Sequence, residues 1–196
     1  MKNLLYISVI FVLFNALPAS AQFTVDDGIG IYFDQEDPES SSFSTEAPFA
    51  LVTAYLMLTN PSSVSNFEGE DRAVSGWECE VVVGGSPTAP SWTLAGTQPL
   101  NVGTAPEFMV GVGIEGLALP VSAEDAVLLA TYTCYVMAPT DEVALRVDPY
   151  IVPSFDPITP GYSASHDAST LIPLSANRPA TINTTLSESP TGCSVD

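Results

Sequence analysis

Basic side chains are nearly absent from this sequence. Its 196 residues include four lysine and arginine residues against 23 aspartate and glutamate residues, which gives a formal net charge of −19. Proteins bind nucleic acids through basic side chains that neutralise phosphates, so the composition excludes a nucleic-acid partner. An acidic surface instead favours solubility, keeps copies of the chain apart and calls for salt or divalent cations to screen it.

Reactive side chains are scarce as well. His166 is the only histidine, and no GxSxG nucleophile motif accompanies the Ser-His-Asp sequence at 165–167. A surface histidine is therefore favoured over a catalytic triad. The histidine and the three cysteines lack zinc-ligand spacing, and nothing selects a pair of carboxylates for glycoside hydrolysis. We expect no enzyme and no catalytic residue.

Long apolar runs are missing after the first residues of the chain. Residues 4–14 form an apolar run of about 11 residues, shorter than the roughly 20 that a membrane-spanning helix needs. Lys2 precedes this run and Ala-Ser-Ala follows at 19–21, so we predict a signal peptide over 1–21. The protein is then secreted, either extracellular or periplasmic, and has no transmembrane anchor. Its mature part keeps three basic and 23 acidic residues, a formal charge of −20.

Helical periodicity is also lacking, whereas two-residue alternation recurs between turns rich in glycine and proline. Such a pattern is typical of short β-strands that pair in two layers. We predict an all-β fold, an antiparallel β-sandwich of jelly-roll or Ig-like architecture, as one domain over 22–185 with a flexible tail at 186–196. It should have about eight or nine strands, near 28–34, 50–59, 74–85, 91–94, 108–114, 127–137, 143–147, 169–174 and 180–184.

The strand at 74–85 is predicted to be the centre of the core. Trp77, Cys79 and Val81 alternate with Glu78 and Glu80, which is typical of a strand with one buried face. Further along the chain, Met109, Gly111 and Gly113 share one face of the strand at 108–114. Glycines on one face indicate that another backbone or a large side chain packs closely there.

Cysteine pairing has two interpretations. Cys79 and Cys134 both lie in the middle of apolar strand faces, and exported proteins commonly form disulfides. A bridge would close a loop of about 55 residues and stabilise the fold by about 4 kcal/mol in the chain-entropy model. Alternatively, both are buried thiols that act as small apolar side chains. Cys193 is left without an assigned partner.

Two sets of residues are candidates for ligand binding. Asp34, Glu36 and Asp37 carry the carboxylates of a candidate calcium site, although their spacing matches no known calcium loop, so solvated charge is the favoured interpretation. Tyr32, Tyr55 and Trp92 are candidates for a flat aromatic platform that stacks on sugars, with packing inside the fold as the favoured alternative. No other cofactor is expected.

Several segments also carry a resemblance to known proteins. They are IGIYFD (29–34), TAYLMLTNPS (53–62), GWECEV (76–81), LNVGT with FMVGVG (100–113) and VLLAT (127–131). With these, the chain resembles an uncharacterised family of small secreted bacterial proteins. LMLTNPS (56–62), LLATYTCYVM (128–137) and VALRVDP (143–149) are more distantly similar to cohesin-like and carbohydrate-binding-like β-sandwiches.

The second resemblance implies a nine-stranded sandwich used for extracellular binding, and it carries over no catalytic residue. Together with the signal peptide, it indicates an exported, non-catalytic module for extracellular binding, adhesion or scaffolding. Its partner would be an extracellular protein or a polysaccharide. A carbohydrate-binding module is the alternative function, and a secreted hydrolase is a less favoured one.

Overall fold

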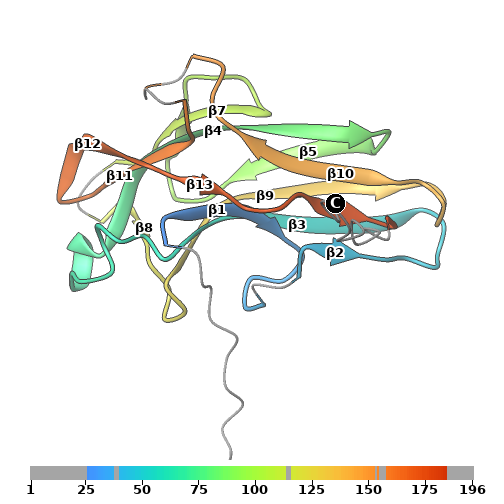
Figure 1. Cartoon of the computed structure of the whole chain (residues 1–196), viewed down its shortest axis with the longest axis horizontal. Coiled ribbons are helices and arrows are strands. Elements are labelled where there is room, and N and C mark those ends of the chain that lie inside the picture. Colours follow the sequence, from blue (N-terminus) through green and yellow to red (C-terminus); the bar gives the residue numbers. More distant parts are fainter. Residues whose placement is uncertain (1–25, 38–39, 114–115, 153, 155–157, 185–196) are drawn as a thin grey trace, which may run out of the picture.

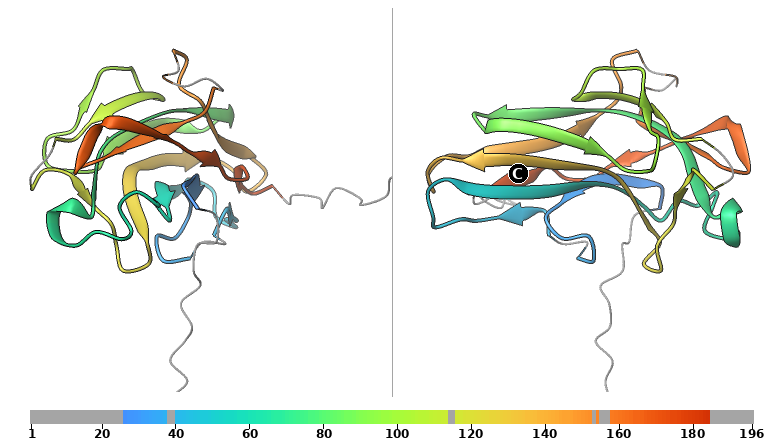
Figure 2. Two further views of the ribbon diagram at one scale, coloured as in Figure 1. Left: turned by 60° about the vertical axis from the view of Figure 1, so that its left-hand side comes forward. Right: turned by 180° about the vertical axis from the view of Figure 1, so that it is seen from behind.

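The computed structural model describes residues 26–184, except 38–39, 114–115, 153 and 155–157. The predicted signal peptide at 1–21, the tail at 186–196 and Cys193 lie outside the described residues. Two layers of strands lie face to face (Figures 1 and 2), so the predicted β-sandwich is confirmed. The one helical element of the described part is a short 3-10 turn at Gly69–Asp71. No helix there is long and apolar enough to cross a membrane.

The first layer, sheet A, has five strands in the order β13-β1-β3-β9-β5. The long strands β3 and β9 lie at its centre. Their outer neighbours are β1 on one side and β5 on the other. The bounds are β13 (Ser175–Ala176), β1 (Gly28–Tyr32), β3 (Ala50–Thr59), β9 (Ala126–Val136) and β5 (Thr88–Leu94).

The second layer, sheet B, is built around β4 (Ala73–Gly85), the strand that the sequence places at the centre of the core. Its main path runs β12-β11-β4-β10-β14-β2, with β7 and β8 also paired to β4, and β6 paired to β7. The bounds are β12 (Asp167–Pro173), β11 (Gly161–Ala164), β10 (Val143–Asp148), β14 (Ala180–Ile182), β2 (Ser42–Phe43), β7 (Glu107–Gly111), β8 (Leu119–Pro120) and β6 (Leu100–Asn101).

Two details of the predicted sandwich are wrong. The described residues form 14 strands rather than eight or nine, and the sheets are mixed rather than antiparallel, since β13 runs parallel to β1 and β2 runs parallel to β14. Four strands, β2, β6, β8 and β13, have only two residues each. That length is too short for alternation to show, and strands reached through long connections rather than hairpins are free to pair in parallel.

The core holds the two sheets together through a row of aromatic rings. Trp77 of β4 is only 2% exposed, and its ring centre lies 5.2 Å from that of Phe108 in β7. Phe108 in turn contacts Trp92 of β5 at 5.2 Å, and Trp92 contacts Tyr132 of β9 at 4.8 Å. The row therefore crosses from sheet B to sheet A, and the predicted burial of Trp77, Cys79 and Val81 is confirmed.

A polar link joins the sheets at one end of the sandwich. Tyr162 of β11 donates its hydroxyl to the Asp27 Oδ1 atom at 2.8 Å, and Asp27 directly precedes β1. The backbone amide and the hydroxyl of Ser62 also donate to the Asp27 carboxylate, at 2.9 and 2.6 Å. This single carboxylate thus connects sheet A, sheet B and the loop that follows β3.

Candidate functional site

The outer face of sheet A is an uncharged surface built by strand alternation. In β3 and β9 every second residue points into the core, which leaves their other side chains on the outside. Across the two strands, Leu51 pairs with Tyr135 and Thr53 pairs with Thr133. We define the open face of sheet A as Phe49, Leu51, Thr53, Thr131, Thr133, Tyr135 and Met137, with Ser91 and Thr93 from the adjoining strand β5.

The apolar end of the open face is well exposed. Phe49 is 67% exposed, Leu51 58%, Tyr135 44% and Met137 38%. Leu51 and Tyr135 are direct cross-strand partners, and the Phe49 amide donates to the Met137 carbonyl at 3.3 Å, so the four residues lie at the same end of the β3–β9 pair. Large apolar side chains that gather on a folded surface, rather than lying singly, mark a site of interaction.

Hydroxyl groups fill the middle of the open face. Thr133 lies between Thr53 of β3 and Ser91 of β5, and the Ser91 and Thr133 hydroxyl oxygens are 2.7 Å apart in a hydrogen bond. Thr131 and Thr93 form the next cross-strand pair. The face therefore combines an apolar end with a hydroxyl-rich centre and carries no charged side chain, in a chain with 23 acidic residues.

The opposite end of the same face is closed by packing. Tyr32, paired with Tyr55 across the strands, is buried together with Met57 and Ala126. The Asn177 amide donates to the Tyr32 hydroxyl, and burial raises the pKa of this phenol above its usual value. Sheet A is thus open to solvent only from the Thr131 row toward Phe49.

The structure does not bring the three predicted aromatic residues together. Tyr32 and Tyr55 are neighbours on the outer face of sheet A, but Tyr32 is buried there. Trp92 packs inward against Phe108 and Tyr132 as part of the aromatic row. The aromatic residue that the open face does expose is Tyr135, which the sequence analysis did not single out. The sequence feature that indicates its exposure is the alternation of Thr131, Thr133 and Tyr135 with the apolar residues of the same strand.

Cys79 and Cys134 are free and buried, one in each sheet. Burial raises the pKa of the Cys79 thiol, and the neighbouring carboxylates of Glu78 and Glu80 raise it further. Burial likewise raises the pKa of Cys134, an effect that a hydrogen bond with Tyr132 partly offsets. In the structure both residues therefore act as small core side chains rather than as a disulfide.

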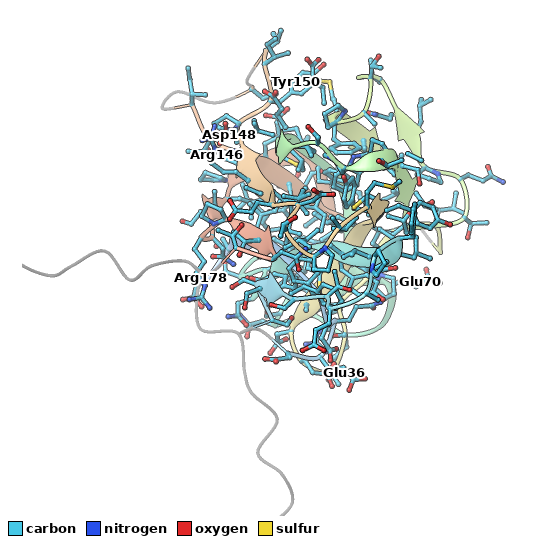
Figure 3. The ribbon with its side chains drawn as sticks, turned by 90° about the vertical axis from the view of Figure 1, so that its right-hand side faces the viewer. Glu36, Glu70, Arg146, Asp148, Tyr150 and Arg178 are labelled. Carbon is cyan, nitrogen blue, oxygen red and sulfur yellow. The ribbon has the colours of Figure 1, made fainter. Side chains whose placement is uncertain are left out.

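The residues of the candidate calcium site are exposed and lie in a loop held by local hydrogen bonds. The Asp34 Oδ1 atom accepts the Glu36 amide at 2.9 Å, and the Ser40 hydroxyl donates to the Asp37 carbonyl at 2.7 Å. In the part of the chain that the structure describes, no three carboxylate, histidine or cysteine side chains gather as a metal site would need. Glu36 and Glu70, the latter in the 3-10 turn, lie on separate segments of the chain (Figure 3). The calcium site stays a prediction.

His166 lies on the surface, stacked on the Phe67 ring with a centre-to-centre distance of 4.0 Å. The Ser165 hydroxyl donates to the backbone carbonyls of Glu70 and Asp71, at 2.9 and 3.3 Å, rather than to the histidine. Asp167 accepts the Ser169 hydroxyl at 2.7 Å. The three residues of the Ser-His-Asp sequence thus have separate partners.

The fold and the open face together define a β-sandwich with an uncharged outer sheet surface. No family model and no curated protein matches the chain. Among solved structures, the chain is similar to a type II cohesin domain from the cellulosome of Acetivibrio cellulolyticus, with 12% sequence identity and a TM-score of 0.42. The match covers 81% of this chain and 96% of that domain. It is a likeness of strand arrangement alone.

Proposed function

We propose that this protein is an exported, non-catalytic module that binds a partner protein through the open face of sheet A. The observation that supports this function is the adjoining set of exposed residues Phe49, Leu51, Tyr135 and Met137 beside uncharged hydroxyl groups. The centres of protein interfaces are depleted in charge and enriched in aromatic residues and methionine. The acidic residues that the structure describes lie outside this face, where they favour solubility of the remaining surface.

A non-catalytic role agrees with how the reactive side chains are held. The Ser165 hydroxyl is bonded to backbone carbonyls, His166 stacks on Phe67, and the described cysteines are buried with raised thiol pKa values. A nucleophile needs an adjacent base and access to substrate. Among the described residues the serine hydroxyl has no base hydrogen-bonded to it, and the two thiols are shut off from substrate by burial. A secreted hydrolase is accordingly the less favoured function.

Carbohydrate binding is the second candidate function, and one observation favours it. Tyr135 exposes its ring next to the Thr133 and Ser91 hydroxyls, the combination of stacking surface and hydrogen-bonding groups that a sugar uses. The aliphatic side chains of Leu51 and Met137 on the same face favour a protein partner. The platform predicted from Tyr32, Tyr55 and Trp92 gives no support to this alternative, since Trp92 faces the core.

The test compares a variant of the open face with a matched variant elsewhere. Leu51→Asp combined with Tyr135→Asp places two charges on the face, while Ile151→Asp makes the same change at an exposed apolar residue on the loop after β10. The immobilised wild type is offered the extracellular proteins of its own organism, and a retained protein is then produced and titrated directly. We expect the double variant to bind it about tenfold or more weakly and Ile151→Asp to bind it as the wild type does.

Two outcomes contradict the proposal. One is a partner whose affinity the double variant leaves unchanged, which would place the binding surface elsewhere. The other is retention of the protein by insoluble polysaccharide but by no protein, with loss of retention in Tyr135→Ala, which would establish the carbohydrate-binding alternative. Hydrolysis of a glycan or ester that is lost in His166→Ala would instead show an enzyme.

A further inference from the structure

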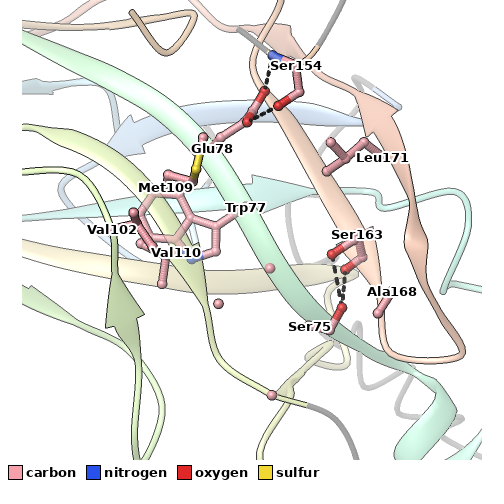
Figure 4. Close-up of a pocket in the computed structure, with 13 residues that line it drawn as sticks. Ser75, Trp77, Glu78, Val102, Met109, Val110, Ser154, Ser163, Ala168 and Leu171 are labelled. Carbon is pink, nitrogen blue, oxygen red and sulfur yellow. Dashed lines mark hydrogen bonds between the residues drawn. The ribbon is translucent and has the colours of Figure 1, made fainter. Parts of the chain in front are cut away.

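A groove lies on the outer face of sheet B, on the other side of the sandwich from the open face of sheet A. Its floor is β4, and its two walls are β7 with the chain after β6 on one side and the β11–β12 hairpin on the other (Figure 4). The cavity volume is about 390 Å³. This lies within the range of about 300–1,000 Å³ that is typical of ligand sites.

Two paired glycines form part of the floor of the groove. Gly76 of β4 pairs with Gly111 of β7, and a methyl group added at Gly111 would meet nothing within 4 Å. The walls are mostly apolar, with Val102 and Met109 on one side and Leu171 on the other. The sequence predicts that a backbone or a large side chain packs over the glycines of this strand. At Gly113 the Leu117 side chain lies 3.2 Å from where a Cβ would be, whereas at Gly111 the structure leaves that space open.

One end of the groove contains a buried carboxylate. Glu78 is only 3% exposed, and its Oε1 and Oε2 atoms accept the amide and the hydroxyl of Ser154, at 3.0 and 2.7 Å (Figure 4). Both donors are neutral and come from one exposed residue. A carboxylate removed from water is stabilised far better by a cation than by neutral donors alone.

The protein supplies no such cation to Glu78 in its described part. Its two ion pairs there join Arg72 to Asp125 and Arg146 to Asp148. Beyond Glu78 on the same face of the sheet, Glu80 lies directly between Glu107 of β7 and Asp148 of β10. Asp148 is ion-paired with Arg146, whose charge also reaches Glu80, so among the described residues the carboxylate without a cation at this end of the groove is that of Glu78.

We propose that this groove binds an arginine side chain displayed by a partner protein. The apolar part of that side chain would lie along the glycine floor between Met109 and Leu171, and its guanidinium would replace the neutral donors of Ser154 on Glu78. Arginine fits better than lysine because its head group is planar, weakly hydrated and able to donate two parallel hydrogen bonds to one carboxylate. This site is separate from the open face and does not depend on the function proposed for it.

The probe is a capped glycine-arginine-glycine tripeptide, compared with the same peptide containing citrulline, which has the same shape without the charge. Binding is followed by backbone amide shifts in NMR spectra of the folded protein, with peptide up to about 10 mM at an ionic strength of about 0.15 M. We expect the arginine peptide to shift the amides of Gly76, Gly111 and Ser163, and the citrulline peptide to leave them unchanged.

Three variants distinguish binding in the groove from nonspecific attraction of the peptide to the acidic surface. Glu78→Gln should weaken binding of the arginine peptide about tenfold or more, since it removes a charge-assisted hydrogen-bonded pair. Gly111→Leu should abolish binding by filling the groove, and Gly111 has neither a positive φ nor a close neighbour that would strain the fold. Glu80→Gln removes the same charge two residues along the same strand face but outside the groove lining, so its binding should change less than about twofold.

The site is disproved if the citrulline peptide binds as well as the arginine peptide, if the arginine peptide shifts no groove amide, or if Glu80→Gln weakens binding as much as Glu78→Gln. Spectra of each free variant first show that it is folded. If Glu78→Gln does not fold, Gly111→Leu and the citrulline peptide still decide the outcome. Binding that survives in Gly111→Leu also excludes the groove.

Discussion

The two described cysteines have an environment that suppresses thiol chemistry. Both are buried, and in each case burial raises the thiol pKa, so the reactive thiolate is scarce at neutral pH. In a Cys193→Ser background we expect neither cysteine to react with a maleimide in the native protein. Both should react once the protein is unfolded in guanidinium without reductant. Mass spectrometry counts the added labels.

The same measurement tests the alternative interpretation of these residues. A disulfide between Cys79 and Cys134 would leave the unfolded, unreduced protein without label and would allow labelling only after reduction. Rapid labelling of the native protein would contradict the burial of both side chains. The exposed, low-pKa environment of a reactive cysteine would then have to exist at one of them.

Tyr162 makes the stability of the fold sensitive to alkali. Burial raises the pKa of its phenol to about 12, whereas an unfolded chain ionises tyrosine near pH 10. The contribution of this buried phenol to the free energy of unfolding is therefore fully present below about pH 10. It is lost as the pH rises toward 12, because only the unfolded state releases the proton readily. Urea unfolding at pH 8 and at about pH 11 should show a smaller alkaline loss in Tyr162→Phe than in the wild type.

At pH 8 the same variant should be less stable than the wild type by about 1 kcal/mol, since Asp27 loses a buried donor but keeps those of Ser62. Tyr135→Phe is the matched control, because that hydroxyl is on an exposed side chain of the open face. An equal alkaline loss in wild type and Tyr162→Phe would show that this phenol ionises alike in the folded and unfolded states.

Residue types alone could predict which face of a strand is buried but not how a polar side chain is used. The alternation around Trp77 predicts that Cys79 and Val81 lie on the core face of the strand and Glu78 on the outer face. The structure places all three residues on those faces. The burial of Glu78 under Ser154 was not predictable, because the two residues are 76 positions apart and meet only through the loop after β10. Trp92 is similar, since its core contacts come from two other strands.

At the scale of the element, the two faces of β4 have different roles: Trp77 lies on the core face, which stabilises the fold, and Glu80 lies on the outer face, which carries charge. Trp77→Ala should reduce the free energy of unfolding by about 3–5 kcal/mol, because it removes a fully packed indole from the row that joins the sheets. Glu80→Gln should instead change it by no more than about 0.5 kcal/mol, since Glu80 lies opposite Glu107 and Asp148 but also near Arg146, which is paired with Asp148. Urea unfolding of both variants measures these changes, and equal losses would mean that the two faces are exchanged.

The long strands were predictable as elements because each has enough residues to show its period. β3 (Ala50–Thr59) coincides with its predicted range, and β4 and β9 each begin within one residue of the start predicted for them. β11 was missed, because its four residues lie in a proline-rich segment and pair with β4 only in the folded chain. The two-residue strands exist only as backbone pairs, so no side-chain pattern encodes them.

At the scale of the whole molecule, the net charge of −19 should make stability depend on ionic strength. Repulsion among like charges destabilises the compact state, and salt screens it over a Debye length of about 10 Å at 0.1 M. We expect the melting temperature to rise with sodium chloride. We expect calcium chloride at matched ionic strength to raise it equally, because Asp34, Glu36 and Asp37 are exposed, the Asp34 carboxylate accepts the Glu36 amide, and no three ligand side chains gather among the described residues. A larger rise with calcium that disappears in Asp34→Asn would contradict this and establish a calcium site, since a ligand that binds only the folded state stabilises it by mass action.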